Sequence, residues 1–142
     1  MMPHKNDPDA PLPKPAKAPC KTCPYRKDVP AGIWHPTEYQ KLPLYDGETF
    51  EQRSMSLFFC HQQDGNLCAG WIGCHDPVEL LALRLHRVHP STYEYRSSVP
   101  LFASGAAAAA HGMSKVEDPD DNALKAISRL SRARKRKTAG FV

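Results

Sequence analysis

The segment Cys20-Lys21-Thr22-Cys23-Pro24 decides how this chain is interpreted. Its two cysteines stand three positions apart, so a tight turn between them can direct both sulfur atoms to one side. Three more cysteines follow at positions 60, 68 and 74. Several thiolates close together are the ligands that zinc and iron–sulfur clusters require. The spacing therefore predicts a metal centre.

We expect the metal to be held by four cysteines, Cys20, Cys23, Cys60 and Cys68. Seven residues separate Cys60 from Cys68, and a loop of that length closes easily. Cys74 is the competing fourth ligand, because a thiolate just before the start of a helix is favoured by the helix dipole. A small buried thiol is the preferred interpretation of Cys74.

Two histidines adjoin these cysteines. Neighbouring residues rarely reach one ion together, so His61 is expected to bond to the backbone near the site. His75 is the better candidate for a substitute ligand, or for a donor to the metal-bound thiolates. Zinc is favoured because a closed four-thiolate site suits a small domain that needs stabilisation. A 4Fe-4S cluster is the alternative.

Composition divides the 142 residues into three parts. Residues 1–18 hold five of the fourteen prolines and little apolar surface, which predicts a disordered arm. Residues 19–113 should form one small domain, and residues 114–142 a linker and a helical tail. No apolar run could span a bilayer, and the amino terminus lacks a signal peptide's hydrophobic centre. We therefore expect a cytoplasmic protein with reduced cysteines.

Local patterns predict a small, loop-rich α+β domain that the metal stabilises. A strand is expected at residues 55–60, Met-Ser-Leu-Phe-Phe-Cys, with Cys60 at its end. Short helices are expected at residues 36–42, 77–88 and 106–110. The second has the strongest start, because Asp76 can cap it and Pro77 suits its first turn. Gly112 is expected to end the third.

The carboxyl-terminal tail has its own charge. The first 121 residues carry twelve Lys and Arg against fifteen Asp and Glu, whereas the last 21 carry seven cations and no acid. Leu124, Ile127 and Leu130 recur every three residues, which predicts a helix with a narrow apolar stripe, capped by residues 120–122. The cations that could contact nucleic-acid phosphates are Arg132, Arg134, Lys135, Arg136 and Lys137. A solvated tail is the alternative.

Four motifs contain the cysteines or lie close to them in the sequence. They are Cys-x2-Cys-Pro-Tyr-Arg at 20–26, Asp-Val-Pro-Ala-Gly-Ile-Trp at 28–34, Phe-Cys-His-Gln at 59–62 and Cys-Ala-Gly-Trp at 68–71. Together they resemble an uncharacterised family of cysteine-containing proteins, a domain of unknown function found in actinobacteria and their phages. The resemblance covers residues 19–87 and brings no established activity. It implies that one pattern contains Cys20, Cys23, Arg26, Cys60, His61, Cys68 and His75. Cys74 falls outside it.

Three classes of function fit these observations. The favoured one is a metal-stabilised binding or regulatory module that contacts nucleic acid, or a protein bound to nucleic acid, through its tail. The second is an iron–sulfur redox or sensor protein. The third is a dithiol or metal-dependent enzyme, for which Cys20 and Cys23 would need a βαβ surrounding that the pattern lacks. No catalytic residue is therefore assigned.

Overall fold

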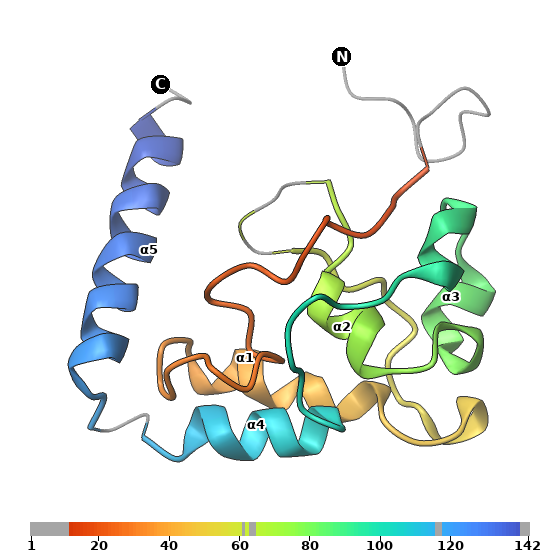
Figure 1. The fold of residues 1–142 in the computed structure, drawn as a ribbon, viewed down its shortest axis with the longest axis horizontal. Coiled ribbons are helices and arrows are strands. Elements are labelled where there is room, and N and C mark those ends of the chain that lie inside the picture. Colours follow the sequence, from red (N-terminus) through yellow and green to blue (C-terminus); the bar gives the residue numbers. More distant parts are fainter. Residues whose placement is uncertain (1–11, 61, 63–64, 116–117, 140–142) are drawn as a thin grey trace.

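The computed structural model describes residues 12–60, 62, 65–115 and 118–139, with side chains through residue 132, as short helices joined by loops (Figure 1). The α-helices are α1 (Pro36–Gln40), α2 (Ala69–Cys74), α3 (Leu81–Leu85), α4 (Gly105–Met113) and α5 (Asp121–Ala139). The 3₁₀ helices are η1 (Leu42–Tyr45), η2 (Thr49–Glu51), η3 (Pro77–Glu79) and η4 (Pro90–Glu94). A membrane span needs both length and apolar character, and none of these helices has both.

The loop-rich architecture is confirmed, but the β component is wrong for the described residues, which pair only through isolated bridges. Within the predicted strand at 55–60, Phe59 alone is bridged, antiparallel to Leu67. The pairing is this short because the segment around Leu67, with which the predicted strand pairs, is itself short. Helix α2 starts at Ala69, so only a few residues beside Leu67 remain extended. A longer ladder has nothing to pair with.

The core lies between α2 and the pair formed by α1 and α4, which run side by side along one face (Figure 1). The predicted helix at 36–42 is confirmed as α1. Its Tyr39 ring lies over Gly112, where a Cβ atom would overlap the ring. Gly112 therefore sits inside α4 as a packing site and does not end the helix, contrary to our prediction.

The predicted helix at 77–88 is broken into η3 and α3. Asp76 caps its start as expected, since Oδ1 accepts from the N–H of Val78 at 3.1 Å. The side-chain amide of Gln52 then intervenes: Oε1 accepts from the N–H of Leu81 at 2.9 Å, and Nε2 donates to the carbonyl of Glu79 at 2.8 Å. These bonds replace helical ones, so the chain turns and buries Leu80 completely.

Helix α5 stands at the opposite end of the molecule from α3 (Figure 1). Asp120 caps it, because Oδ1 accepts from the N–H of Ala123 at 2.8 Å. Ala123 and Ala126 are buried, and Ile127 and Leu130 are partly buried against the core. Leu124 is 51% exposed, so the predicted stripe is wrong at that residue. Two alanines bring the helix closer to the core than a leucine would, and they set its inner face.

The described part of the amino-terminal segment lies against the domain. The N–H of Leu67 donates to the carbonyl of Lys14 at 2.8 Å, and the N–H of Ala16 donates to the carbonyl of Leu67 at 3.0 Å. Ala16 is only 2% exposed. The prediction of a disordered arm is therefore wrong for residues 12–18, because prolines are compatible with an extended segment whose intervening residues make the bonds. Residues 1–11 lie outside the described part.

Candidate metal centre

Cys20 and Cys23 lie in a turn that the backbone stabilises. The N–H of Cys23 donates to the carbonyl of Cys20 at 2.9 Å, and the N–H of Arg26 donates to the carbonyl of Cys23 at 3.1 Å. The indole Nε1 of Trp34 donates to the carbonyl of Thr22 at 2.9 Å and holds the turn from the core side. Cys23 is buried and Cys20 half-buried.

The side chain of Arg26 closes this turn from the outside. Its Nε and Nη2 donate to the two carboxylate oxygens of Asp28, both at 2.7 Å, and its Nη1 donates to the carbonyl of Pro19 at 3.2 Å. The guanidinium therefore joins the residue before Cys20 to a residue beyond Cys23. The Asp28 carboxylate raises the pKa of Arg26, and Arg26 lowers the pKa of Asp28. Sequence reasoning included Arg26 in a motif but did not identify this bridging role.

Cys60 and Cys68 are presented by a two-stranded turn that we call the cysteine hairpin, residues 58–60 and 66–68. The N–H of Cys60 donates to the carbonyl of Asn66, and the N–H of Cys68 donates to the carbonyl of Phe58, both at 2.8 Å. Because side chains alternate along paired segments, Cys60 and Cys68 share one face of the hairpin. Leu67 lies on the other face. This alternation explains how two cysteines eight positions apart point the same way.

Cys68 also begins helix α2. Its Sγ accepts from the N–H of Trp71 at 3.4 Å, so the sulfur caps the helix in place of an oxygen.

The four thiols of the turn and the hairpin meet inside the molecule. Sγ of Cys23 lies 3.8 Å from Sγ of Cys68. The thiol of Cys20 interacts with the thiols of both Cys23 and Cys60. These contacts form a series from Cys60 through Cys20 and Cys23 to Cys68. They remain pairwise: within the described residues, no three Cys, His, Asp or Glu side chains form a group that could hold a metal ion as they stand.

Burial and mutual contact raise the pKa values of two of these thiols, Cys20 and Cys23. The neighbouring Cys23 thiol and burial raise the pKa of Cys20. For Cys23, the Cys20 thiol lowers the pKa, but Cys68 and burial outweigh it, so that its pKa lies well above the ordinary value. A cation would reverse this balance, because it stabilises thiolates directly.

Cys74 lies outside the series, at the carboxyl end of α2. Burial raises its pKa to about 12, and the charges of Asp46 and Cys23 add to this effect. A neutral, half-buried thiol agrees with the interpretation of Cys74 as a small buried thiol that binds no metal. The helix that was expected to favour its thiolate form is only the short η3. His61, the other neighbour of the predicted ligands, lies outside the described residues.

Both ring nitrogens of His75 are engaged by oxygen atoms. Nδ1 lies 2.8 Å from the carbonyl of Trp71, and Nε2 lies 3.0 Å from Oδ1 of Asp46. The Asp46 carboxylate also accepts from the N–H groups of Gly105 and Ala106, at 2.7 and 2.8 Å. His75 therefore connects the end of α2 to the start of α4. Both ring nitrogens have oxygen partners, which gives His75 a structural role in place of the predicted role of substitute ligand or donor to the metal-bound thiolates.

Gly70 makes room for the sulfur of Cys23. A Cβ atom at Gly70 would overlap Sγ of Cys23 and would come within 2.9 Å of the Cβ of Tyr25. The ring of Trp71, the next residue, stacks on Phe58 with centroids 6.2 Å apart, and both aromatic residues are buried in the core. Sequence reasoning missed Gly70, although Cys-Ala-Gly-Trp carried the signal: a glycine beside a candidate ligand.

Predicted phosphate-binding residues lie on α5. Arg132 is exposed, and so are Lys125 and Arg129, which stand seven and three positions before it on the same flank of the helix. Arg134, Lys135, Arg136 and Lys137 also belong to α5, but their side chains lie outside the described part.

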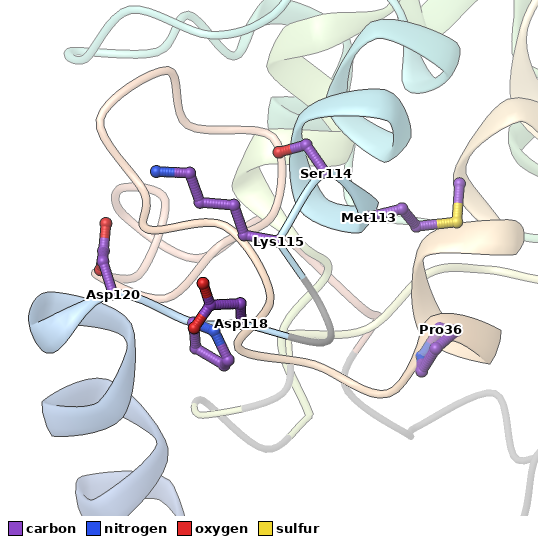
Figure 2. Close-up of a pocket in the computed structure, with 7 residues that line it drawn as sticks. Pro36, Met113, Ser114, Lys115, Asp118 and Asp120 are labelled. Carbon is purple, nitrogen blue, oxygen red and sulfur yellow. The ribbon is translucent and has the colours of Figure 1, made fainter.

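Two hollows lie away from the four thiols. One, of about 780 Å³, separates the end of α4 from the start of α5 (Figure 2). Its lining residues are Pro36, Met113, Ser114, Lys115, Asp118, Pro119 and Asp120. The other, of about 700 Å³, is bordered by Cys74 and His75 and by residues 93–103. None of the four clustered cysteines lines either hollow.

Comparison with family models gives a match. The model of a family of unknown function (DUF6283) matches residues 15–134, which include the amino-terminal segment from Pro15, all five α-helices at least in part, and every cysteine. This range extends beyond the residues 19–87 on which the sequence motifs lie. Searches with the chain matched no curated protein and no solved structure.

Proposed function

The chain belongs to this family of unknown function, and we propose that it is a small zinc-binding module whose ligands are Cys20, Cys23, Cys60 and Cys68. The observation that carries the proposal is the 3.8 Å between Sγ of Cys23 and Sγ of Cys68. Four sulfurs at about 2.3 Å from a tetrahedral zinc ion lie about 3.8 Å from one another. A disulfide would need about 2.05 Å.

The remaining two ligands are Cys20 and Cys60. Cys20 already interacts with Cys23 and Cys60, so rotation of thiol side chains could close the series into a tetrahedron. Because zinc must displace the thiol protons, its affinity should rise with pH. The binding free energy then adds to the stability of a domain with a modest core.

The spacing favours zinc over a 4Fe-4S cluster. A cluster binds its thiolates at its outer corners, which hold the sulfur atoms farther apart than one ion does. To bind a cluster, the sulfur atoms of Cys23 and Cys68 would have to move apart. The sulfur of Cys23 already packs against the backbone of Gly70 in α2, which leaves little room for that movement. An iron–sulfur redox or sensor protein is the second candidate, and its support is the same four-thiol set. A dithiol or metal-dependent enzyme has less support, and we assign no catalytic residue.

We propose that the module binds nucleic acid, or a protein bound to nucleic acid, through α5. Its exposed cations Lys125, Arg129 and Arg132 support phosphate contacts, and no acidic residue follows Asp121 in the sequence to oppose them. We place the protein in the cytoplasm, where thiols stay reduced. The actinobacterial or phage origin implied by the motifs is part of this proposal.

The decisive experiment is elemental analysis with a visible spectrum on protein purified without oxygen. We expect one zinc ion per chain and no visible absorption. A brown protein with broad absorbance near about 400 nm would favour the iron–sulfur candidate. Stoichiometric absence of both metals would refute the metal centre altogether. The Cys74→Ser variant is the matched control, since it removes a thiol that lies outside the series.

A further inference from the structure

Residues 13–19, which we call the strap, form a third extended segment beside the cysteine hairpin. Pro15 is bridged in parallel to Leu67. The strap bonds to Leu67 on both sides, through the carbonyl of Lys14 at 2.8 Å and the N–H of Ala16 at 3.0 Å. Leu67 is completely buried, so the strap satisfies both of its backbone groups where water cannot.

Other contacts hold the strap along its length. The N–H of His89 donates to the carbonyl of Pro13 at 2.8 Å, and Oη of Tyr95 donates to the carbonyl of Lys17 at 3.4 Å. At its end, Arg26 donates to the carbonyl of Pro19, as described above. The strap is therefore fastened to the hairpin, to the region of η4 and to the Cys20–Cys23 turn.

This pairing joins the two segments that carry the thiols. Ala16 precedes Cys20 by four residues, and Leu67 immediately precedes Cys68. Once Ala16 is paired with Leu67, the segment carrying Cys20 can explore only a small volume around Cys68. Without that pairing, the two thiols would be brought together across the long chain between residues 20 and 68, at a higher cost in loop entropy. Preorganisation of this kind increases affinity by reducing the entropy lost on binding.

We propose that the strap is a positioning element for the metal centre, so that strap docking and metal binding strengthen each other. This inference rests on the proposed function. Coupling of this kind is reciprocal: a docked strap increases metal affinity by the same factor by which bound metal favours docking. The segment predicted to be a disordered arm thereby contributes to the site without supplying a ligand.

The test compares three variants in their affinity for zinc, measured by competition with a chromophoric chelator. Ala16→Asp puts a charge at the buried centre of the strap and should weaken zinc binding by about tenfold, within the usual range for coupled sites. Lys17→Asp changes an exposed strap residue and should leave the affinity unchanged. Ala123→Asp, like Ala16→Asp, puts a charge at a buried alanine, but on α5. It should also leave the affinity for zinc unchanged.

Two further measurements separate positioning from loss of fold. Far-UV circular dichroism of the zinc-loaded variants reports folding. If Ala16→Asp fails to fold, removal of residues 1–15 replaces it and should weaken zinc binding similarly. Limited trypsin digestion of zinc-loaded protein should cut after Lys17 at least tenfold faster in Ala16→Asp than in the unsubstituted chain, because an undocked strap is accessible.

The outcomes distinguish the inference from the function on which it rests. Unchanged zinc affinity in Ala16→Asp, or equal weakening in Ala16→Asp and Ala123→Asp, would overturn the positioning role while leaving a zinc protein. An unsubstituted chain that binds no zinc would instead overturn the proposed function, and the inference with it.

Discussion

The backbone of Gly70 lies so close to Sγ of Cys23 that a Cβ atom on Gly70 would overlap the sulfur. The glycine belongs to α2, where helix propensity alone favours alanine by about 1 kcal/mol. Packing against the thiol and helix propensity therefore make opposite demands at this position.

Gly70→Ala should destabilise the zinc-loaded protein by about 1–3 kcal/mol, the usual cost of overpacking, and should weaken zinc binding because Cys23 must move. Urea unfolding and chelator competition measure the two effects. Gly73→Ala in the same helix is the control, since a Cβ there would come within 2.8 Å of Leu101 Cδ1, the end of a flexible side chain, and within 3.2 Å of the Cβ of Ser97, and none of these neighbours is a thiol. If Gly70→Ala stabilises the protein, the gain in helix propensity outweighs the cost of the contact with the Cys23 sulfur.

Replacement of Cys20, Cys23, Cys60 or Cys68 by serine, one at a time, should release the metal and unfold the domain, because metal-binding energy is folding energy here. Cys74→Ser should keep the metal and most of the stability. Metal content after gel filtration and far-UV circular dichroism check both expectations. Loss of metal from Cys74→Ser together with its retention in Cys60→Ser would reverse our choice of ligands.

The pKa of Cys74, raised by burial from 9.0 to about 12, gives the stability a pH dependence. Below pH 9 the thiol is protonated in both the folded and the unfolded chain. As the pH rises from 9 toward 12 the unfolded chain loses this proton first, so the free energy of unfolding falls, by at most about 1.4 kcal/mol per pH unit. Cys74→Ser should show a shallower decline in urea unfolding across this range. Parallel curves would contradict the raised pKa.

Removal of residues 132–142 should leave metal content and folding unchanged, since the buried residues of α5 precede them. It should weaken nucleic-acid binding almost equally for all sequences, because phosphate contacts carry no base information. For the full chain, log affinity should fall with log salt concentration at a slope of roughly −4, and the truncated chain, which keeps Lys125 and Arg129, should have a clearly shallower slope.

Lys41→Gln is the control for total charge in this binding experiment, because Lys41 pairs with Glu38 on α1, far along the chain from the tail. Its salt dependence should match that of the unsubstituted chain. A full chain that binds neither DNA nor RNA at low salt would make α5 a solubilising or protein-docking helix.

Local signals in the sequence were reliable where one residue acts on its immediate neighbours. Asp76 and Asp120 cap the helices that they precede, and Pro36 opens α1. The Cys20–Cys23 turn follows from its spacing, and the structure brings both into contact with the other two cysteines that we selected. These interactions span only a few residues, so sequence reasoning reaches them.

Interactions between distant segments could not be predicted in this way. Gln52 interrupts a helix that begins 25 positions later, at Pro77, and Tyr39 occupies the space above Gly112. Lys14 and Ala16, which pair with Leu67, belong to a proline-rich segment whose composition, taken alone, indicates disorder. Nothing in the local sequence specifies such partners, because the tertiary fold selects them.

The two bonds from the strap to Leu67 have a consequence for self-association. An extended segment with free N–H and carbonyl groups can pair with the same segment of another molecule. The strap occupies these groups of Leu67 beside the reduced thiols. A chain without its strap would expose them, and two molecules paired there would bring their cysteines together, where air oxidation could cross-link them. The strap thus keeps the backbone groups of Leu67 paired within their own molecule, next to the cysteines.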